Sequence, residues 1–182
     1  MVDQQYMAGL QRELLALKIT DWYDMVYSWQ WTLVALLFIV PWIIWWKYVD
    51  RKHIPQILVF GLIVALLSSF LNSSGLNLML WSYPYRLLPF SDRMYSVSYA
   101  VIPVIFMFLH QYSPGWRPFT ASLVVTAAII AFVAQPILTA VGMYKIMNWN
   151  YFYSFLTLIF IGVISRLTQQ LVLKESSHTG TL

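Results

Sequence analysis

The chain has no cysteine and few charged residues. Only 10% of its 182 residues are charged, whereas about 25% is usual in soluble domains. The absence of cysteine excludes disulfides, thiolate metal sites and cysteine nucleophiles, and it gives no indication of the redox compartment. Hydrophobic residues make up 60% of the chain, and the mean hydropathy is +0.66. This composition predicts a protein whose solvent is lipid.

Familiar catalytic and nucleotide-binding motifs are also missing. The sequence contains no GxSxG, HExxH, P-loop or dinucleotide-binding pattern. Its three histidines, His53, His110 and His178, lie too far apart for an evident metal site, so we expect no metal and no cofactor. The net charge of +4 is scattered over short breaks between apolar runs. This distribution favours membrane lipids, and not nucleic acid, as the partner.

Five apolar segments are long enough to cross a membrane. A spanning helix needs about 20 mostly apolar residues, because each residue adds about 1.5 Å and the hydrocarbon core is roughly 30 Å thick. These segments lack the alternation of membrane β-strands. The predicted fold is an all-α membrane protein, a bundle of five transmembrane helices within residues 29–173. The predicted spans are 29–48, 55–72, 94–112, 118–144 and 149–171.

The two ends of the chain have a different composition. Residues 1–28 have no basic start followed by an apolar run, so they do not resemble a signal peptide. Tyr6, Leu10, Leu14 and Leu17 recur at helical spacing among polar residues. This pattern predicts a short amphipathic helix that lies on the outer membrane surface. Residues 174–182 are predicted to be a flexible polar tail.

The distribution of Lys and Arg predicts the orientation in the membrane. The break KYVDRKH, residues 47–53, holds the densest basic cluster, and basic loops remain in the cytoplasm. With five spans, this places the N-terminus outside and the C-terminus in the cytoplasm. We therefore expect a multi-pass protein of the plasma membrane, in which the loop 80–93 faces outward.

Prolines and polar residues inside the spans mark a possible cavity. Pro41, Pro103 and Pro136 each lack an N–H group, so three helices are expected to kink. Kinked helices can line a cavity, but proline is also common in membrane helices that line none, and the sequence leaves both interpretations open. The cavity candidates are Ser98, Tyr99, His110 and Gln135.

Two of these candidates carry further expectations. His110 lies near the cytoplasmic end of its span, where a structural role competes with proton relay. Gln135 shares a helix face with Ala127 and Ala131, so we expect it to point into the bundle. Its amide should then bond to a neighbouring helix, through Tyr99, Ser98, Ser154 or Thr157. No Asp, Glu or Lys lies within the predicted spans, which argues against ion-coupled transport and acid-catalysed chemistry.

The loop between the second and third spans, LWSYPYRLLPFSDR, is rich in aromatic residues, proline and arginine. Aromatic rings are enriched at membrane interfaces, and the two prolines favour a fixed turn. In an alternative interpretation, the arginines bind lipid phosphates or a partner, since guanidinium groups suit bidentate phosphate contacts. The candidate ligand- or partner-binding residues are Trp81, Tyr83, Tyr85, Arg86 and Arg93.

Several motifs, taken in order, carry a resemblance to a known family. They are PWIIWWKYVDRK (41–52), LWSYPYRLLP (80–89), PVIFMFLHQYSPGW (103–116), AQPIL (134–138) and WNYFYSF (149–155). In these the chain resembles an uncharacterised family of small integral membrane proteins from spore-forming Gram-positive bacteria. The resemblance implies a five-helix membrane protein with no known activity. The resemblance implies that relatives often carry acidic residues around the positions of Ser98 and Gln135, where this chain is neutral.

Two classes of function are compatible with these features. The first is a non-enzymatic membrane subunit that binds lipid, a membrane protein partner or a second copy of the chain through the outer aromatic and arginine loop. The alternative is an intramembrane enzyme or permease for a hydrophobic or neutral small molecule, which uses a cavity between kinked helices. A ligand beside Gln135 would favour the second class, and one beside Arg86 the first.

Overall fold

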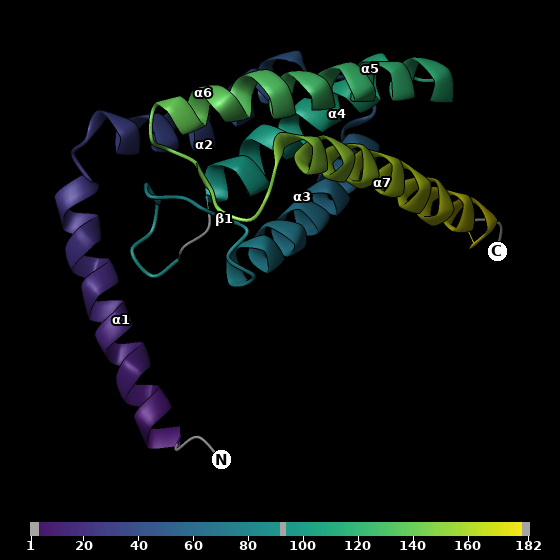
Figure 1. Cartoon of the computed structure of the whole chain (residues 1–182). Helices are drawn as coiled ribbons and strands as arrows, with labels where there is room; N and C mark the ends of the chain where they lie inside the picture. Colours follow the sequence, from purple (N-terminus) through teal and green to yellow (C-terminus); the bar gives the residue numbers. More distant parts are fainter. Residues whose placement is uncertain (1–3, 92–93, 180–182) are drawn as a thin grey trace.

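The computed structural model describes residues 4–91 and 94–179, with side chains up to residue 172, and it is mainly helical (Figure 1). A single pair of two-residue strands occurs in the described part, with Trp81 opposite Ile146 and Ser82 opposite Lys145. The α-helices are α1 (Gln4–Met25), α2 (Trp29–Tyr48), α3 (Ile54–Asn77), α4 (Ile102–Tyr112), α5 (Trp116–Ile129), α6 (Gln135–Ala140) and α7 (Tyr151–Thr179). The short elements are the π-helical turns η1 (Val97–Val101) and η2 (Ile130–Ala134) and the strands β1 (Trp81–Ser82) and β2 (Lys145–Ile146).

Four helical segments are long and apolar enough to cross a membrane, which supports a membrane protein. They are Trp29–Tyr48, Ile54–Asn77, Trp116–Ala140 and Tyr151–Val172. The fifth predicted span corresponds to a shorter apolar helix, Val97–Tyr112. Large apolar side chains point outward along these segments, for example Leu66 (68% exposed) and Phe132 (47%). Such a surface is expected to face lipid, because a bundle in water would bury these side chains.

Of the three prolines predicted to kink a helix, Pro103 and Pro136 are each accommodated by a π-helical turn. The amide of Ile102 donates to the carbonyl of Val97, just before Pro103, and the amide of Gln135 donates to the carbonyl of Ile130, just before Pro136. Each bond reaches back five residues, so the wider turn absorbs the loss of the proline N–H without ending the helix. Pro41, by contrast, lies inside the uninterrupted helix α2.

The core forms where small residues let helices approach closely. Gly61 of α3 faces Met107 of α4, and a Cβ atom on Gly61 would lie 2.4 Å from the Met107 sulfur. Gly162 of α7 likewise faces Leu123 of α5, at 2.6 Å. In the absence of a hydrophobic drive between helices in lipid, such close contacts are the main source of helix association. Helix α3 packs against both α4 and α7 and is central in the bundle.

Hydrogen bonds fix which loops share an end of the bundle. At one end, the Gln111 side chain donates to the Tyr48 carbonyl (3.0 Å) and accepts from the Asp50 amide (3.1 Å), which joins the end of α4 to the α2–α3 loop. At the other end, the Asn72 amide donates to Ser98 Oγ (2.9 Å), which joins the last turns of α3 to the start of the α4 segment. Helices α3 and α4 are therefore antiparallel and run between the same two ends.

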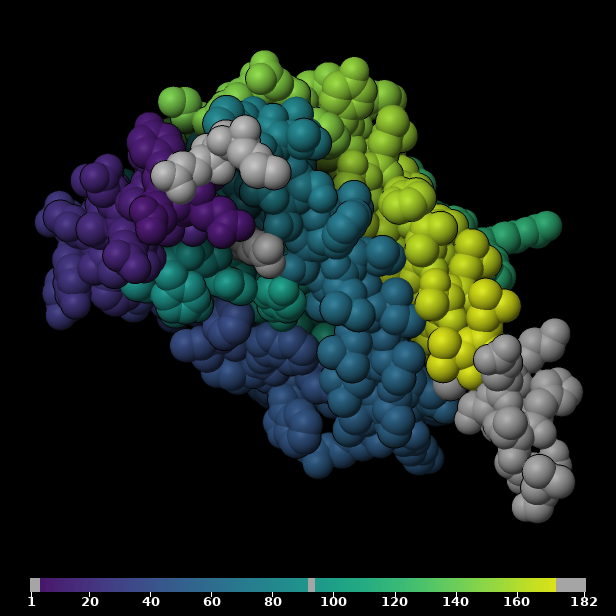
Figure 2. Space-filling model, turned by 90° about the horizontal axis from the view of Figure 1, so that it is seen from below, coloured from purple at the N-terminus to yellow at the C-terminus, as the bar shows by residue number. Residues whose placement is uncertain are grey.

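The predicted N-terminal helix exists, as α1, and it runs crosswise to α5, α6 and α7 (Figure 1). In the view from below, α1 is gathered at one end of the molecule and α7 extends toward the other (Figure 2). The Trp22 indole donates to the Leu87 carbonyl (3.1 Å), and Asp21 lies 3.7 Å from Arg86. These contacts fix the end of α1 to the loop between β1 and η1. No α1 residue is buried in the protein.

Helix α7 has two features that the sequence did not indicate. It continues to Thr179, into the stretch 174–182 predicted as a flexible polar tail. It also buries Arg166, which is only 3% exposed. The guanidinium donates to the carbonyls of Ser113 (3.1 Å) and Pro114 (2.7 Å) and lies 4.2 Å from the centre of the Phe119 ring. Arg166 thus neutralises the carbonyl end of α4 and fixes the turn into α5.

Candidate functional site

A cavity of about 320 Å³ lies among α3, α4 with η1, the α5–η2–α6 segment and α7. Its walls are mostly apolar, with Val101, Ile105, Ile130 and Leu158 among the lining residues. Both π-helical turns contribute to the wall. This volume falls near the lower end of the range for small-molecule pockets, about 300 to 1,000 Å³. We call this space the inner cavity.

Polar side chains from four elements line the inner cavity between its apolar walls. Ser98 comes from η1, Gln135 from α6, Ser154 and Thr157 from α7, and Asn72 from α3. Ser98 and Ser154 are 2% and 7% exposed. A mostly apolar cavity with a few converging neutral hydrogen-bonding groups is typical of a site for a small, largely hydrophobic molecule.

Gln135 lies at the inner cavity, but the predicted hydrogen bond is absent. Its side-chain oxygen is buried and has no hydrogen-bond partner among the described residues. Ser98, Ser154 and Thr157 line the same cavity, yet Thr157 bonds to the Tyr153 carbonyl of its own helix (2.8 Å) and Ser154 accepts from Trp149 (2.9 Å). The predicted partners are thus engaged elsewhere, and the amide oxygen remains available to a ligand.

Asn72 is the most highly connected polar residue of the site. Its side-chain oxygen accepts from the Trp81 indole (3.0 Å) and from the Tyr83 hydroxyl (3.2 Å), while its amide donates to Ser98 (2.9 Å). Burial raises the pKa of the Tyr83 phenol far above its usual value, so this hydroxyl stays protonated and remains a donor. Sequence reasoning missed Asn72, because it took this residue as the end of a span.

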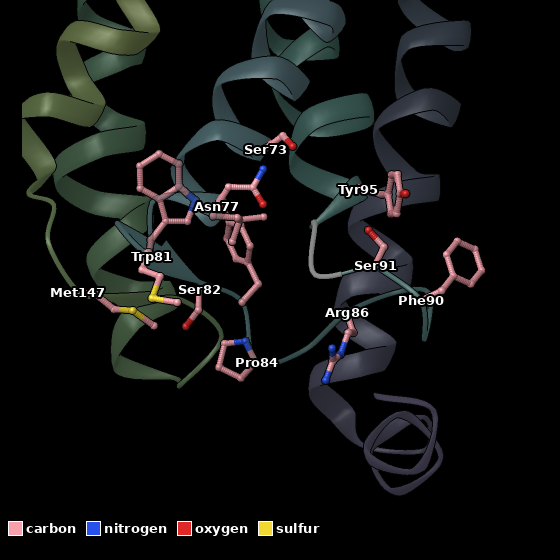
Figure 3. Close-up of a pocket in the computed structure, with 13 residues that line it drawn as sticks. Ser73, Asn77, Trp81, Ser82, Pro84, Arg86, Phe90, Ser91, Tyr95 and Met147 are labelled. Atoms are coloured by element: carbon pink, nitrogen blue, oxygen red, sulfur yellow. The ribbon is translucent and has the colours of Figure 1, made fainter. Parts of the chain in front are cut away.

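A second, larger cavity of about 670 Å³ lies outside Trp81 and Tyr83. We call it the outer cavity. Figure 3 shows Trp81, Ser82 and Met147 on one side and Arg86, Ser91 and Tyr95 on the other, with Phe90 pointing away. The rest of the lining includes hydroxyl and amide groups, among them Ser73 and Asn77 of α3. Trp81 and Tyr83 line both cavities.

The structure separates the predicted loop residues into different environments. Trp81, Tyr83 and Arg86 line the outer cavity, although Arg86 also lies beside Asp21 of α1. Tyr85 was expected to join them, but it packs instead against the small apolar cluster of Val34, Met94 and Met143, because the loop turns its ring toward α2. Arg93 lies outside the described residues, as does Asp92.

Two of the predicted cavity residues lie elsewhere. Tyr99 follows Ser98 directly, so in this helical turn it points to a different face, toward α2 and α3, where its hydroxyl bonds to Ser69 (2.6 Å). His110 lies at the far end of α4, stacked on Phe60 at 4.5 Å between ring centres. Neither residue is among those that line the inner cavity. The cavity predicted from sequence therefore contains Ser98 and Gln135 but not Tyr99 or His110.

The chemistry available in the inner cavity is neutral. Among the described residues that line it there is no carboxylate, histidine, lysine or arginine, and the only ionisable groups are the phenols of Tyr83 and Tyr144. Burial raises the pKa of both phenols well above the usual value, so neither can act as a base near neutral pH. In the described part of the chain, no group of metal-binding side chains is present. These residues can bind and orient a ligand but provide no acid–base pair.

No protein-family model, curated protein or solved structure matches the chain. The resemblance to a family of small membrane proteins from spore-forming bacteria therefore stays a prediction.

Proposed function

We propose that this protein binds a small hydrophobic molecule with a neutral polar group inside the membrane, without transforming it. The observation that carries this proposal is the buried, unpartnered oxygen of Gln135 at an otherwise apolar cavity of about 320 Å³. A ligand that donates a hydrogen bond, such as an alcohol or an amide, would pair this oxygen, and its apolar part would contact the surrounding aliphatic side chains. The lack of an acid or base in the lining favours binding over catalysis.

The proposal includes five membrane spans, with Val97–Tyr112 as the fifth. The antiparallel arrangement of α3 and α4 between the same two ends supports this count. With the basic α2–α3 loop in the cytoplasm, the N-terminus, the α3–α4 loop and the outer cavity face outward across the plasma membrane, and the C-terminus is cytoplasmic. The crosswise course of α1, with its exposed apolar residues, supports an interfacial position on that outer side (Figure 1).

The proposal is tested by filling the inner cavity. Ala134 lines the inner cavity, whereas its neighbour Val133 is 53% exposed on the outside of the same turn. We expect wild-type protein, purified in mild detergent and analysed by native mass spectrometry, to carry a small molecule that Ala134→Phe loses and Val133→Phe retains. Equal retention in all three proteins, or a wild type that carries nothing, would refute the proposal.

A second candidate function is binding of a lipid headgroup or a membrane protein partner at the outer cavity. It is favoured by the position of Trp81, Tyr83 and Arg86 around one polar space. In that case Arg86 supplies charge, and α1 forms part of the contact surface.

This second candidate is tested by separating the charge of Arg86 from its contact with α1. Arg86→Gln removes the guanidinium, whereas Asp21→Asn removes only the carboxylate that lies 3.7 Å from it. If the outer cavity binds anionic lipid, Arg86→Gln should lower co-purified anionic lipid several-fold, and Asp21→Asn should leave it unchanged. Loss in both variants would instead mean that the contact with α1 holds the loop together.

A further inference from the structure

The inner and outer cavities are separated by the same two side chains. Trp81 and Tyr83 line both spaces, and in each case the polar atom of the ring bonds to one acceptor, the side-chain oxygen of Asn72. One side of this partition is lined largely by hydroxyl, amide and guanidinium groups, and the other is largely aliphatic.

The two rings of the partition are held by their bonds to Asn72 and by contacts with neighbouring rings. β1, which carries Trp81, is paired with β2 over only two residues. The Trp81 ring rests edge-on against Trp149 (5.0 Å between centres), and Tyr83 is tilted against Tyr144 (5.4 Å). Release of the two bonds to Asn72 would remove the polar attachment of both rings to α3 at once, because they share that acceptor.

Helix α3 is shaped to receive the Trp81 ring. Gly75 lies one turn beyond Asn72, and a Cβ atom there would come within 2.1 Å of two carbons of the indole. The ring therefore packs directly against the backbone of Gly75, one turn from Asn72, which accepts its hydrogen bond. The Trp81 ring is therefore held in one defined position by Gly75 and Asn72, which both belong to α3.

We infer that Trp81, Tyr83 and Asn72 form a gate through which the ligand passes between the outer and the inner cavity. The inference rests on the proposed function, since it assigns the route by which the inner cavity is filled. It also defines the ligand class further: an amphiphile that reaches the protein from the outer aqueous surface, whose polar group pairs with the Gln135 oxygen and whose apolar part lies among α4, α5 and α7.

The natural absence of cysteine permits a direct test without background reaction. Thr157→Cys places one thiol at the inner cavity, and Ser82→Cys places one at the outer cavity. A charged, membrane-impermeant maleimide is added to the outer side of cells or oriented proteoliposomes. With the gate intact, Thr157→Cys should react far more slowly than Ser82→Cys. Adding Tyr83→Phe should accelerate labelling of Thr157→Cys by about tenfold, the factor given by loss of one hydrogen bond of ordinary strength.

Two controls make the result specific to the gate. Ser165→Cys lies on the same helix as Thr157 but is fully buried, so its labelling should stay negligible with and without Tyr83→Phe. Trp81→Phe, which removes the indole donor but keeps a ring, should act in the same direction as Tyr83→Phe. The gate is refuted if Thr157→Cys reacts as fast as Ser82→Cys in the otherwise unchanged chain, or if neither gate variant alters its rate.

The labelling experiment requires no ligand, so its outcome is independent of the proposed function. Gated labelling together with no ligand in native mass spectrometry would retain the gate and refute the binding function. A retained ligand together with ungated labelling would support the binding function and refute the gate. It would indicate that the ligand enters from the lipid side.

Discussion

Asn72→Leu is expected to lower the free energy of unfolding by about 2 to 4 kcal/mol, measured by thermal or denaturant unfolding in detergent. The substitution removes the acceptor for the Trp81 indole and the Tyr83 hydroxyl together with the donor to Ser98. An unpaired buried polar group costs about 1 to 3 kcal/mol, while hydrogen bonds within membranes average only about 0.6 kcal/mol. Three bonds at the membrane value contribute about 2 kcal/mol, and the cost of the groups left unpaired raises the total to about 2 to 4 kcal/mol.

A matched substitution on the same helix isolates the network. Asn77 lies on α3 as well, but it is exposed at the rim of the outer cavity. Asn77→Leu should change stability by less than about 0.5 kcal/mol. Ser98→Ala, which removes one of the three partners, should have an intermediate effect. An Asn72→Leu protein as stable as the wild type would mean that these bonds contribute nothing to the fold.

Apolar helices long enough to cross a membrane could be predicted from sequence because length and hydropathy are local properties of the chain. Their ends could not, as α3 shows. Asn72, Ser73 and Ser74 are poor helix formers followed by Gly75, so the predicted span ends at residue 72, yet the helix continues to Asn77. Burial of Asn72 and Gly75 against Trp81 stabilises the extra turn, and that contact depends on tertiary packing.

In the candidate site, too, features that depend on neighbouring residues could be predicted, whereas contacts between distant residues could not. Gln135 was predicted to point into the bundle because an inward face can be inferred from helical periodicity and small neighbours, and it lines the inner cavity together with Ser98. Asn72 and Ser98 are 26 positions apart, and no pattern in a single sequence indicates that they meet. The role of Arg166 was hidden for the same reason: its partners are carbonyls of Ser113 and Pro114, some fifty positions away.

The expectation for Gln135 itself is reversed by the structure. Had its amide bonded to a neighbouring helix, replacement by leucine would weaken the fold. Its side-chain oxygen is instead buried without a partner among the described residues, and such a group destabilises a protein by about 1 to 3 kcal/mol. A residue that lowers stability at a cavity is typical of a functional site, where binding and stability conflict.

Gln135→Leu is therefore expected to stabilise the protein while it weakens ligand binding. Leucine has a similar size, adds apolar contact to the cavity wall and removes the unpaired oxygen, so we expect a gain of about 1 kcal/mol, or a melting temperature about 2 to 4 °C higher. Retention of the co-purified molecule in native mass spectrometry should fall at least about tenfold, as loss of one buried hydrogen bond predicts. The measurement compares the melting curve and the retained ligand in the same preparation.

Gln169 provides the matched control for this substitution. It is 1% exposed on α7, and its amide donates to the Gln56 carbonyl at 2.7 Å. Gln169→Leu removes the same chemical group from a site where it is paired, so it should lower stability by about 1 kcal/mol and leave ligand retention per folded protein unchanged. A Gln135→Leu protein that melts below the wild type would mean that its amide is paired after all. The inner cavity would then lose the polar contact on which the proposed ligand chemistry depends.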